Sequence, residues 1–232
     1  MNNIKHIYAN GCSFTSDDYI KHTLKQSCYP ELLGEHYQVN VTNAGRPGSC
    51  NRRIIRNTLR DSFKFDGDTL VLLQLTFLFR TEKPYTENPS TRWKMQHTTE
   101  EYHESIKDNP LEKHNQEFFK MFYHYYDECA EITNLATDLI MLTGYLRNRN
   151  IPYFIFPYQN LVQPWVLRKM KNNQLLEKLS EDSRILNIMS ENLLNLIGPG
   201  NWYYDQPHGH LDQYGHVKAA EVLANLFDAQ EL

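Results

Sequence analysis

The chain has 232 residues, of which 41% are hydrophobic and 22% charged, and its formal net charge is −4. This length is sufficient for one sizeable hydrophobic core, so we expect a single domain over residues 1–232. Lysine and arginine are scattered along most of the chain, whereas nucleic-acid-binding proteins present a basic face, so no nucleic-acid partner is expected.

The cysteines and the N-terminal sequence bear on the cellular compartment. The four cysteines lack CxxC spacing, so neither a zinc ribbon nor a disulfide framework is predicted. The N-terminus lacks the basic region, apolar run and cleavage site of a signal peptide, and no stretch approaches about 18 consecutive apolar residues. We therefore expect a cytoplasmic protein with no membrane partner.

Strand-like and helix-like segments alternate along the chain. The predicted strands are Ile4–Ala9, Tyr37–Thr42, Thr69–Leu75 and Ile151–Pro157. The last two, TLVLLQL and IPYFIFP, are almost continuously apolar, which is typical of strands buried on both faces of a parallel sheet. The predicted helices are Tyr29–Glu35, Cys50–Ser62, His114–Asn148, Val162–Leu179 and Tyr214–Phe227.

This alternation predicts an α/β fold. We expect three α/β/α layers, right-handed crossovers and a central, mostly parallel sheet of about five strands. Residues 81–113 interrupt the alternation, because they are polar, contain proline and show no clear periodicity. A long insertion of this kind is typical of a functional lid or a mobile segment.

The first predicted strand runs into the stretch ANGCSFTS, residues 9–16, which contains two nucleophile candidates. Cys12 is small and apolar, and we expect it to pack in the core. Ser13 is the better candidate, although a serine in a strand-to-helix turn also serves as a helix cap. Because ligands bind beyond the carboxyl ends of the strands in open α/β sheets, this turn lies where a site is expected.

A nucleophilic serine needs a base and donors for the oxyanion. The stretch DQPHGHLDQYGH, which starts at Asp205, offers His208 or His210 as the base and Asp205 to hold the imidazole. The backbone N–H groups of Ser13 and Gly48 can form an oxyanion hole. The sequence therefore contains the parts of a serine hydrolase in kind.

Three motifs, taken in order, resemble those of the SGNH hydrolases, also called GDSL-like esterases and lipases. GCSF resembles the motif of the serine nucleophile, here Ser13, and NAGRPGSCN resembles the motif whose second glycine, here Gly48, donates to the oxyanion. HLDQYGHVKAAEVLANL resembles the last motif, in which the catalytic histidine stands five residues before a glycine, here His210 before Gly215. The resemblance implies a flavodoxin-like SGNH fold, a Ser-His-Asp triad and no cofactor.

The chain departs from the family pattern in its third motif, normally Gly-x-Asn-Asp. The asparagine that donates to the oxyanion in the family corresponds to Thr76 here. A threonine hydroxyl is shorter but can also donate, so we assign Thr76 to the oxyanion hole. Arg80 either compensates for this change or pairs with Glu82.

A second departure concerns the acid, which stands three residues before the histidine in the family pattern. Counting from Gly215 makes His210 the base and leaves Pro207 at the position of the acid. The interpretation we favour pairs His210 with Asp205 through a longer loop. His208, three residues after Asp205, is the alternative base, and an acid from elsewhere, or none, remains open.

These patterns predict a serine hydrolase that cleaves small ester, thioester or O-acetyl groups, with a small molecule or a carbohydrate ester as substrate. Asn43 and Arg80 follow predicted strands and are expected to contact the substrate. One alternative is a catalytically decayed SGNH-like binding or assembly module. Another is a metal-dependent hydrolase that uses the His-x-His-x-Asp spacing of His208, His210 and Asp212; the favoured reading includes no metal.

Overall fold

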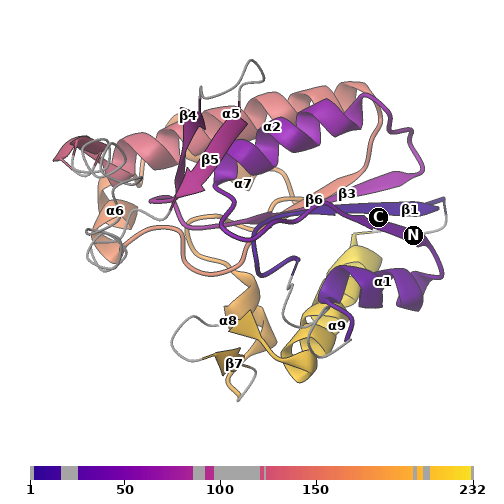
Figure 1. The fold of residues 1–232 in the computed structure, drawn as a ribbon. Coiled ribbons are helices and arrows are strands. Elements are labelled where there is room, and N and C mark those ends of the chain that lie inside the picture. The colour runs from indigo at the N-terminus through magenta and orange to yellow at the C-terminus, as the bar shows by residue number, and fades with distance from the viewer. Residues whose placement is uncertain are drawn as a thin grey trace.

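A computed structural model describes residues 3–16, 26–85, 92–96, 121–122, 124–200, 203–205 and 210–230 (Figure 1). Its elements, in chain order, are β1 (His6–Asn10), α1 (Tyr29–Tyr37), β2 (Asn40–Asn43), α2 (Asn51–Ser62), β3 (Thr69–Leu75), β4 (Thr81–Tyr85), β5 (Arg92–Gln96), α5 (Glu128–Asn148), β6 (Tyr153–Pro157), α6 (Pro164–Lys169), α7 (Gln174–Ser180), α8 (Leu193–Ile197), β7 (Tyr203–Asp205), β8 (His210–Leu211) and α9 (Gln213–Ala229).

The central sheet of the described residues has four parallel strands in the order β2-β1-β3-β6 (Figure 1). All residues of β3 and β6 are buried, as their apolar runs predict. About five strands were expected, and the described sheet has four. Ile155 of β6 also forms one isolated parallel bridge with Ile185. The α/β/α fold class with a mostly parallel sheet is therefore confirmed.

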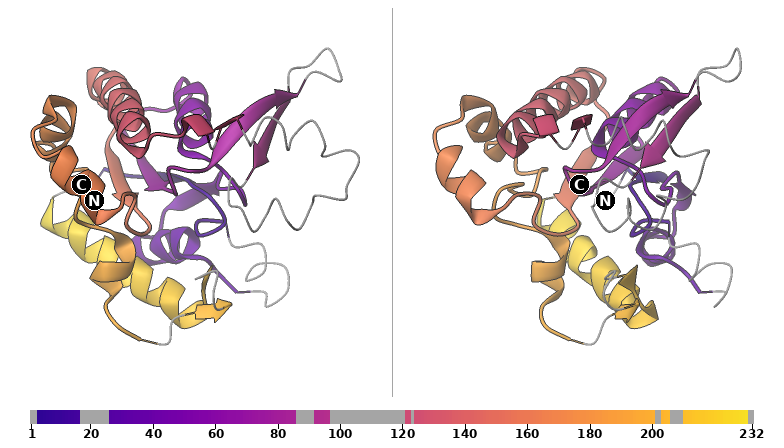
Figure 2. Two further views of the ribbon diagram at one scale, coloured as in Figure 1. Left: turned by 90° about the vertical axis from the view of Figure 1, so that its left-hand side faces the viewer. Right: turned by 60° about the vertical axis from the view of Figure 1, so that its left-hand side comes forward.

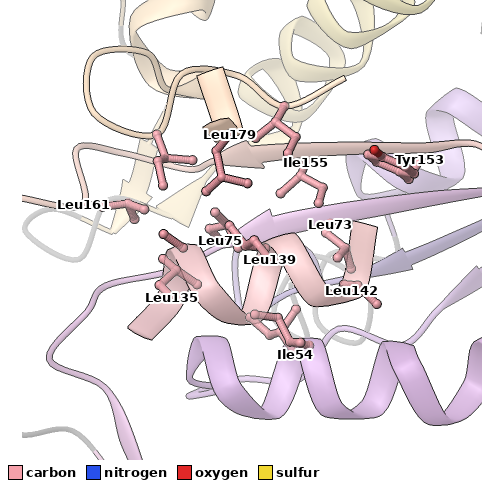
Figure 3. Packing of buried hydrophobic residues seen from close by; sticks show 14 of the residues in the cluster. Ile54, Leu73, Leu75, Leu135, Leu139, Leu142, Tyr153, Ile155, Leu161 and Leu179 are labelled. Atoms are coloured by element: carbon pink, nitrogen blue, oxygen red, sulfur yellow. The ribbon is translucent and has the colours of Figure 1, made fainter. Parts of the chain in front are cut away.

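Each face of the sheet is covered by its own group of helices. Leu73 and Leu75 of β3 pack against α2, α5 and α7, and Figure 3 shows Leu75 beside Leu139 and Leu73 beside Leu142, both of α5. Leu70 and Leu72, which alternate with them, belong to the cluster formed with α1, α8 and α9. This alternation is what a strand with two buried faces requires.

Two predicted helices are interrupted in the structure. The segment 114–148 was expected to be one helix, but α5 begins at Glu128, because the Asp127 side chain accepts hydrogen bonds from the backbone N–H groups of Cys129 and Ala130. Residues 162–179 form α6 and α7, and Asn173 caps α7 in the same way. Apolar spacing continues across both breaks, so periodicity alone missed them. No described helix combines the length and apolarity needed to cross a bilayer.

The insertion at 81–113 contains regular structure that its polar composition did not predict. The strands β4 and β5 pair antiparallel from Thr81 opposite Gln96 to Tyr85 opposite Arg92. Figure 2 shows this hairpin, in magenta, extending away from the central sheet. These two strands were not among the predicted ones, and the role of the insertion as a lid stays a prediction.

Candidate active site

The Ser13 turn begins where β1 ends at the carboxyl edge of the sheet. The backbone N–H groups of Thr15 and Ser16 both donate to the carbonyl of Cys12, at 3.0 and 3.1 Å, which closes a tight turn. A Cβ atom on Gly11 would lie 2.1 Å from Thr15 Oγ1, so only glycine fits there. Ser13 is partly exposed between its buried neighbours, so the turn presents this one side chain at its surface.

Gln74 of β3 fixes the turn from the neighbouring strand. Its Oε1 accepts hydrogen bonds from the backbone N–H of Cys12 at 3.2 Å and from Thr15 Oγ1 at 3.0 Å, and its Nε2 donates to the Leu75 carbonyl. The side chain is fully buried. Gln74 was not among the predicted site residues, although it is the single polar residue in the run Leu70–Leu75, which was the available signal.

His210 faces this turn from β8. Its Nε2 lies 2.9 Å from Ser13 Oγ, and its ring packs against Phe14 with centroids 4.8 Å apart. Leu211 anchors the short strand in the core, and Asp212 accepts from the backbone N–H of Gly215 at 2.7 Å, which caps α9. The start of α9 therefore holds the imidazole against the serine.

Asp205 was predicted as the acid that holds His210, and His208 as the alternative base. The antiparallel pair of β7 and β8 sets the backbone of Asp205 directly opposite His210. His208 lies outside the described residues. The structure thus brings together Ser13, His210 and the backbone of Asp205.

The loop after β2 is hydrogen-bonded to the Ser13 turn. Arg46 N–H donates to the Gly11 carbonyl at 3.2 Å, and the Asn43 amide donates to the carbonyl of Thr15 at 2.9 Å. Asn43 also donates to Glu31 and accepts from the N–H of Gly45, so its amide joins the loop to its surroundings. Its predicted contact with substrate stays a prediction.

Gly48 stands in the same loop, just before α2. Its φ of 73° lies in the left-handed region, where a side chain would be strained. The glycine therefore permits the bend that leads into α2.

The position that departs from the third family motif is tied to this loop by Asn51, the first residue of α2. The Asn51 side chain accepts from the N–H of Thr76 at 2.8 Å and donates to its carbonyl at 2.9 Å. Sequence analysis quoted Asn51 as the end of a motif but gave it no role. The Thr76 hydroxyl accepts from Arg80 Nη1 at 3.0 Å.

A scan of the sequence against protein-family models finds no match, and a search among curated proteins finds no significant relative. Among solved structures, the chain is similar to the psychrotrophic esterase EstA from Pseudoalteromonas sp., with 11% identity, 98% of both chains covered and a TM-score of 0.54. It is also similar to a member of the lipolytic protein G-D-S-L family from Veillonella parvula DSM 2008, with 13% identity, 96% of this chain and 98% of the other covered, and a TM-score of 0.51.

The chain has the SGNH hydrolase fold. The resemblance inferred from the three motifs is therefore confirmed at the level of the fold. Within the SGNH fold of this chain, the Ser13 turn, the loop 43–48, Thr76 and His210 all follow strands or precede α9, as a site at the carboxyl edge requires.

The metal-site alternative rests on His208, His210 and Asp212. In the SGNH fold of this chain, the Asp212 carboxylate caps α9 and Nε2 of His210 faces Ser13. Within the described ranges, no group of three or more His, Cys, Asp or Glu residues is arranged to hold a metal ion.

Proposed function

We propose that the protein is a serine hydrolase of the esterase type, acting on small ester, thioester or O-acetyl substrates. The observation that carries this proposal is the 2.9 Å contact between Ser13 Oγ and His210 Nε2. A serine within hydrogen-bonding reach of an imidazole is the arrangement that activates a hydroxyl as nucleophile. The fold adds support, because similar structures are named an esterase and a lipolytic protein.

The mechanism has two stages. His210 takes the Ser13 proton as the oxygen attacks the substrate carbonyl, and then gives that proton to the leaving alcohol or thiol. Water then hydrolyses the acyl-enzyme, with His210 again acting as base and acid. No step requires a cofactor. We assign Asp205 the role of orienting the imidazole, because its backbone stands opposite His210 in the β7–β8 pair.

The negative charge on the substrate carbonyl oxygen needs donors in the transition state. We assign this role to the backbone N–H groups of Ser13 and Gly48 and to the hydroxyl of Thr76. Support comes from Asn51, which holds the backbone of Thr76 beside the loop that contains Gly48. Asn43 and Arg80 complete the assignment as residues near the substrate.

The test combines covalent labelling with hydrolysis. We expect a fluorophosphonate probe to label the wild-type protein, and short p-nitrophenyl esters to be hydrolysed. Ser13→Ala should abolish both. Cys12→Ala is the matched control, because Cys12 is the adjacent nucleophile candidate but is fully buried, and it should retain labelling.

Two outcomes contradict the proposal. A wild-type protein that neither labels nor hydrolyses any short ester supports the decayed binding module instead. Hydrolysis that survives Ser13→Ala but is lost on treatment with a metal chelator supports the metal-dependent alternative.

A further inference from the structure

Arg80 is a buried cation beside the candidate active site. The residue is 9% exposed, and its Cζ lies 4.8 Å from the ring centroid of Phe77 and 6.0 Å from that of Phe14. Phe14 directly follows Ser13 and packs on His210. The Phe14 ring therefore lies between Arg80 and the imidazole of His210 in this chain of contacts.

No carboxylate among the described side chains balances the positive charge of Arg80. Among the residues whose side chains the structure describes, none forms an ion pair with it within 4.0 Å, and its Nε has no hydrogen-bond partner there. Burial of a charge is costly unless an opposite charge compensates it. A guanidinium kept in this position points to a negative charge that arises during function.

Two acidic residues of α5, Glu131 and Asp138, line a small pocket together with Arg80, but neither forms an ion pair with it. Burial raises the pKa of Asp138, and the cation that opposes this shift is Arg52. Neither acidic group of this pocket therefore forms the ion pair that would compensate the charge of Arg80.

The only hydrogen bond that the guanidinium of Arg80 makes among the described residues runs from Nη1 to the hydroxyl of Thr76, at 3.0 Å. Thr76 is 2% exposed, and no described group accepts the hydrogen of its hydroxyl. A hydroxyl that accepts from a guanidinium is polarised and becomes a stronger donor. The O–H of Thr76 is thus a strengthened hydrogen-bond donor that a substrate atom can accept from.

The strand register sets this donor level with the nucleophile. Asn10 of β1 stands opposite Leu73 of β3 in the parallel pair. Ser13 and Thr76 each follow three residues after these partners, at the same edge of the sheet. A donor from Thr76 is therefore in a suitable place to meet an oxyanion formed at Ser13.

We propose that Arg80 is a positioning residue that acts through Thr76 on the oxyanion of the reaction. Arg80 occupies the acceptor side of the Thr76 hydroxyl, which directs the O–H toward the substrate carbonyl oxygen. When Ser13 adds to the carbonyl, the electron pair of the C=O bond moves to that oxygen, and the charge of Arg80 gains its counter-charge. Arg80 itself stays protonated throughout. The inference rests on the proposed function.

In this view, Thr76 and Arg80 together replace the asparagine of the third SGNH motif. An asparagine amide donates without help, whereas a threonine hydroxyl both donates and accepts and needs a second group to fix its direction. We therefore expect the effects on kcat of substituting Thr76 and Arg80 to be coupled.

The experiment is a double-mutant cycle on p-nitrophenyl acetate, which carries no negative charge. We expect Thr76→Val and Arg80→Met each to lower kcat by about 100-fold, as the loss of one oxyanion donor does, with KM nearly unchanged. The double variant should be no worse than about threefold below the single variants, because Arg80 acts only through Thr76.

A second background keeps the test decisive. Thr76→Asn restores the family's donor, so it should retain activity, and Arg80→Met in this background should cost less than about threefold. Arg149→Met is the matched control, because Arg149 also lies over an aromatic ring, Tyr145 at 5.8 Å, but donates to the backbone carbonyls of Ser62 and Phe65. It should lower the melting temperature and leave kcat unchanged.

Three results overturn the inference. Losses that multiply to about 10⁴-fold in the double variant would show that the two residues act independently. An Arg80→Met variant that raises KM only for esters with a carboxylate in the acyl group would make Arg80 a substrate-binding residue. An inactive wild-type protein overturns the proposed function and this inference with it, whereas an active wild type with multiplying losses overturns the inference alone.

Discussion

Arg184 and Arg80 both lie over aromatic rings, and they differ in how their charge is compensated. Arg184 lies 4.3 Å from the ring of Tyr153 and donates to Asp182 through Nε at 2.9 Å and Nη2 at 3.2 Å. Arg80 lies over Phe77 and Phe14, and its guanidinium has only the hydroxyl of Thr76 as a hydrogen-bond partner among the described residues. Arg184 therefore has its counter-charge within the protein, whereas Arg80 has no carboxylate partner among the described side chains.

The Asp182 cluster shows what full compensation does to an acid. Burial by itself raises the pKa of Asp182, but the hydrogen bonds from Arg184 and Tyr153 outweigh it and hold the pKa below its usual value. Asp182 is therefore charged at neutral pH, with its charge satisfied by its neighbours. A carboxylate whose partners are all supplied by the fold contributes to stability, whereas the role we propose for Arg80 is in the reaction, through Thr76.

The largest effect on activity is expected at His210, on the candidate-site side of this comparison. His210→Ala removes the group that contacts Ser13, so it should lower kcat by several orders of magnitude, about 10⁴-fold or more. His208→Ala should retain most of the activity. Initial rates on short p-nitrophenyl esters measure both. The reverse result would assign the base to His208 and would make the register counted from Gly215 wrong.

The next effect tests how the Ser13 turn is held. Gln74→Leu removes the acceptor of Cys12 N–H and of the Thr15 hydroxyl and leaves buried donors unsatisfied, so stability should fall by about 2 kcal/mol. Displacement of the turn should lower kcat by about 100-fold. Urea unfolding and kcat are the measurements. Thr143→Val, at a buried helical position with a local bond to the Ile140 carbonyl, should affect stability alone, and an unchanged kcat in Gln74→Leu would contradict the role of Gln74.

Substitution of Asp182, which accepts from Arg184 and Tyr153, should lower the free energy of unfolding and leave kcat unchanged. Asp182→Asn replaces a carboxylate that accepts from Arg184 and Tyr153, so the free energy of unfolding at pH 7 should fall by about 2 kcal/mol while kcat stays unchanged. Because the folded pKa of Asp182 is lowered, its stabilisation is complete above the unfolded value of about 4 and is lost as the pH falls through the folded pKa. Urea unfolding at pH 7 and at about pH 3 should therefore show a difference that shrinks in acid. A difference that grows in acid would contradict this assignment.

The smallest effect is expected at Gly144, a helix position outside both arginine clusters, and it concerns stability alone. Nothing lies within 4 Å of a Cβ added to Gly144 in α5, so Gly144→Ala should raise the free energy of unfolding by about 0.5–1 kcal/mol. The contrast is Gly11, where Thr15 Oγ1 leaves no room. Thermal unfolding with unchanged kcat checks the prediction, and a lower melting temperature for Gly144→Ala would refute it.

Much of the fold was predictable, because burial on both faces leaves a strong mark in the sequence. The range predicted for β3, Thr69–Leu75, is the range observed. The breaks before α5 and α7 were not predicted, because they depend on the capping side chains of Asp127 and Asn173 inside continuous apolar patterns. The hairpin β4–β5 was missed because β4 is mostly polar and contains Pro84, and because the apolar alternation of β5 consists only of Trp93 and Met95.

The sequence by itself determined the order of the four strands of the central sheet and named Ser13, His210 and Thr76 as candidates, since each stands at a fixed place after a strand or before the last helix. Only the tertiary structure decided which side chains meet. Ser13 and His210 are 197 residues apart, and their 2.9 Å contact depends on how α9 packs against α1 and the sheet. The bond from Arg80 to Thr76 depends on the direction of a turn, which residue spacing does not encode. Local patterns fix elements, but distances between distant side chains follow from the packing of the whole core.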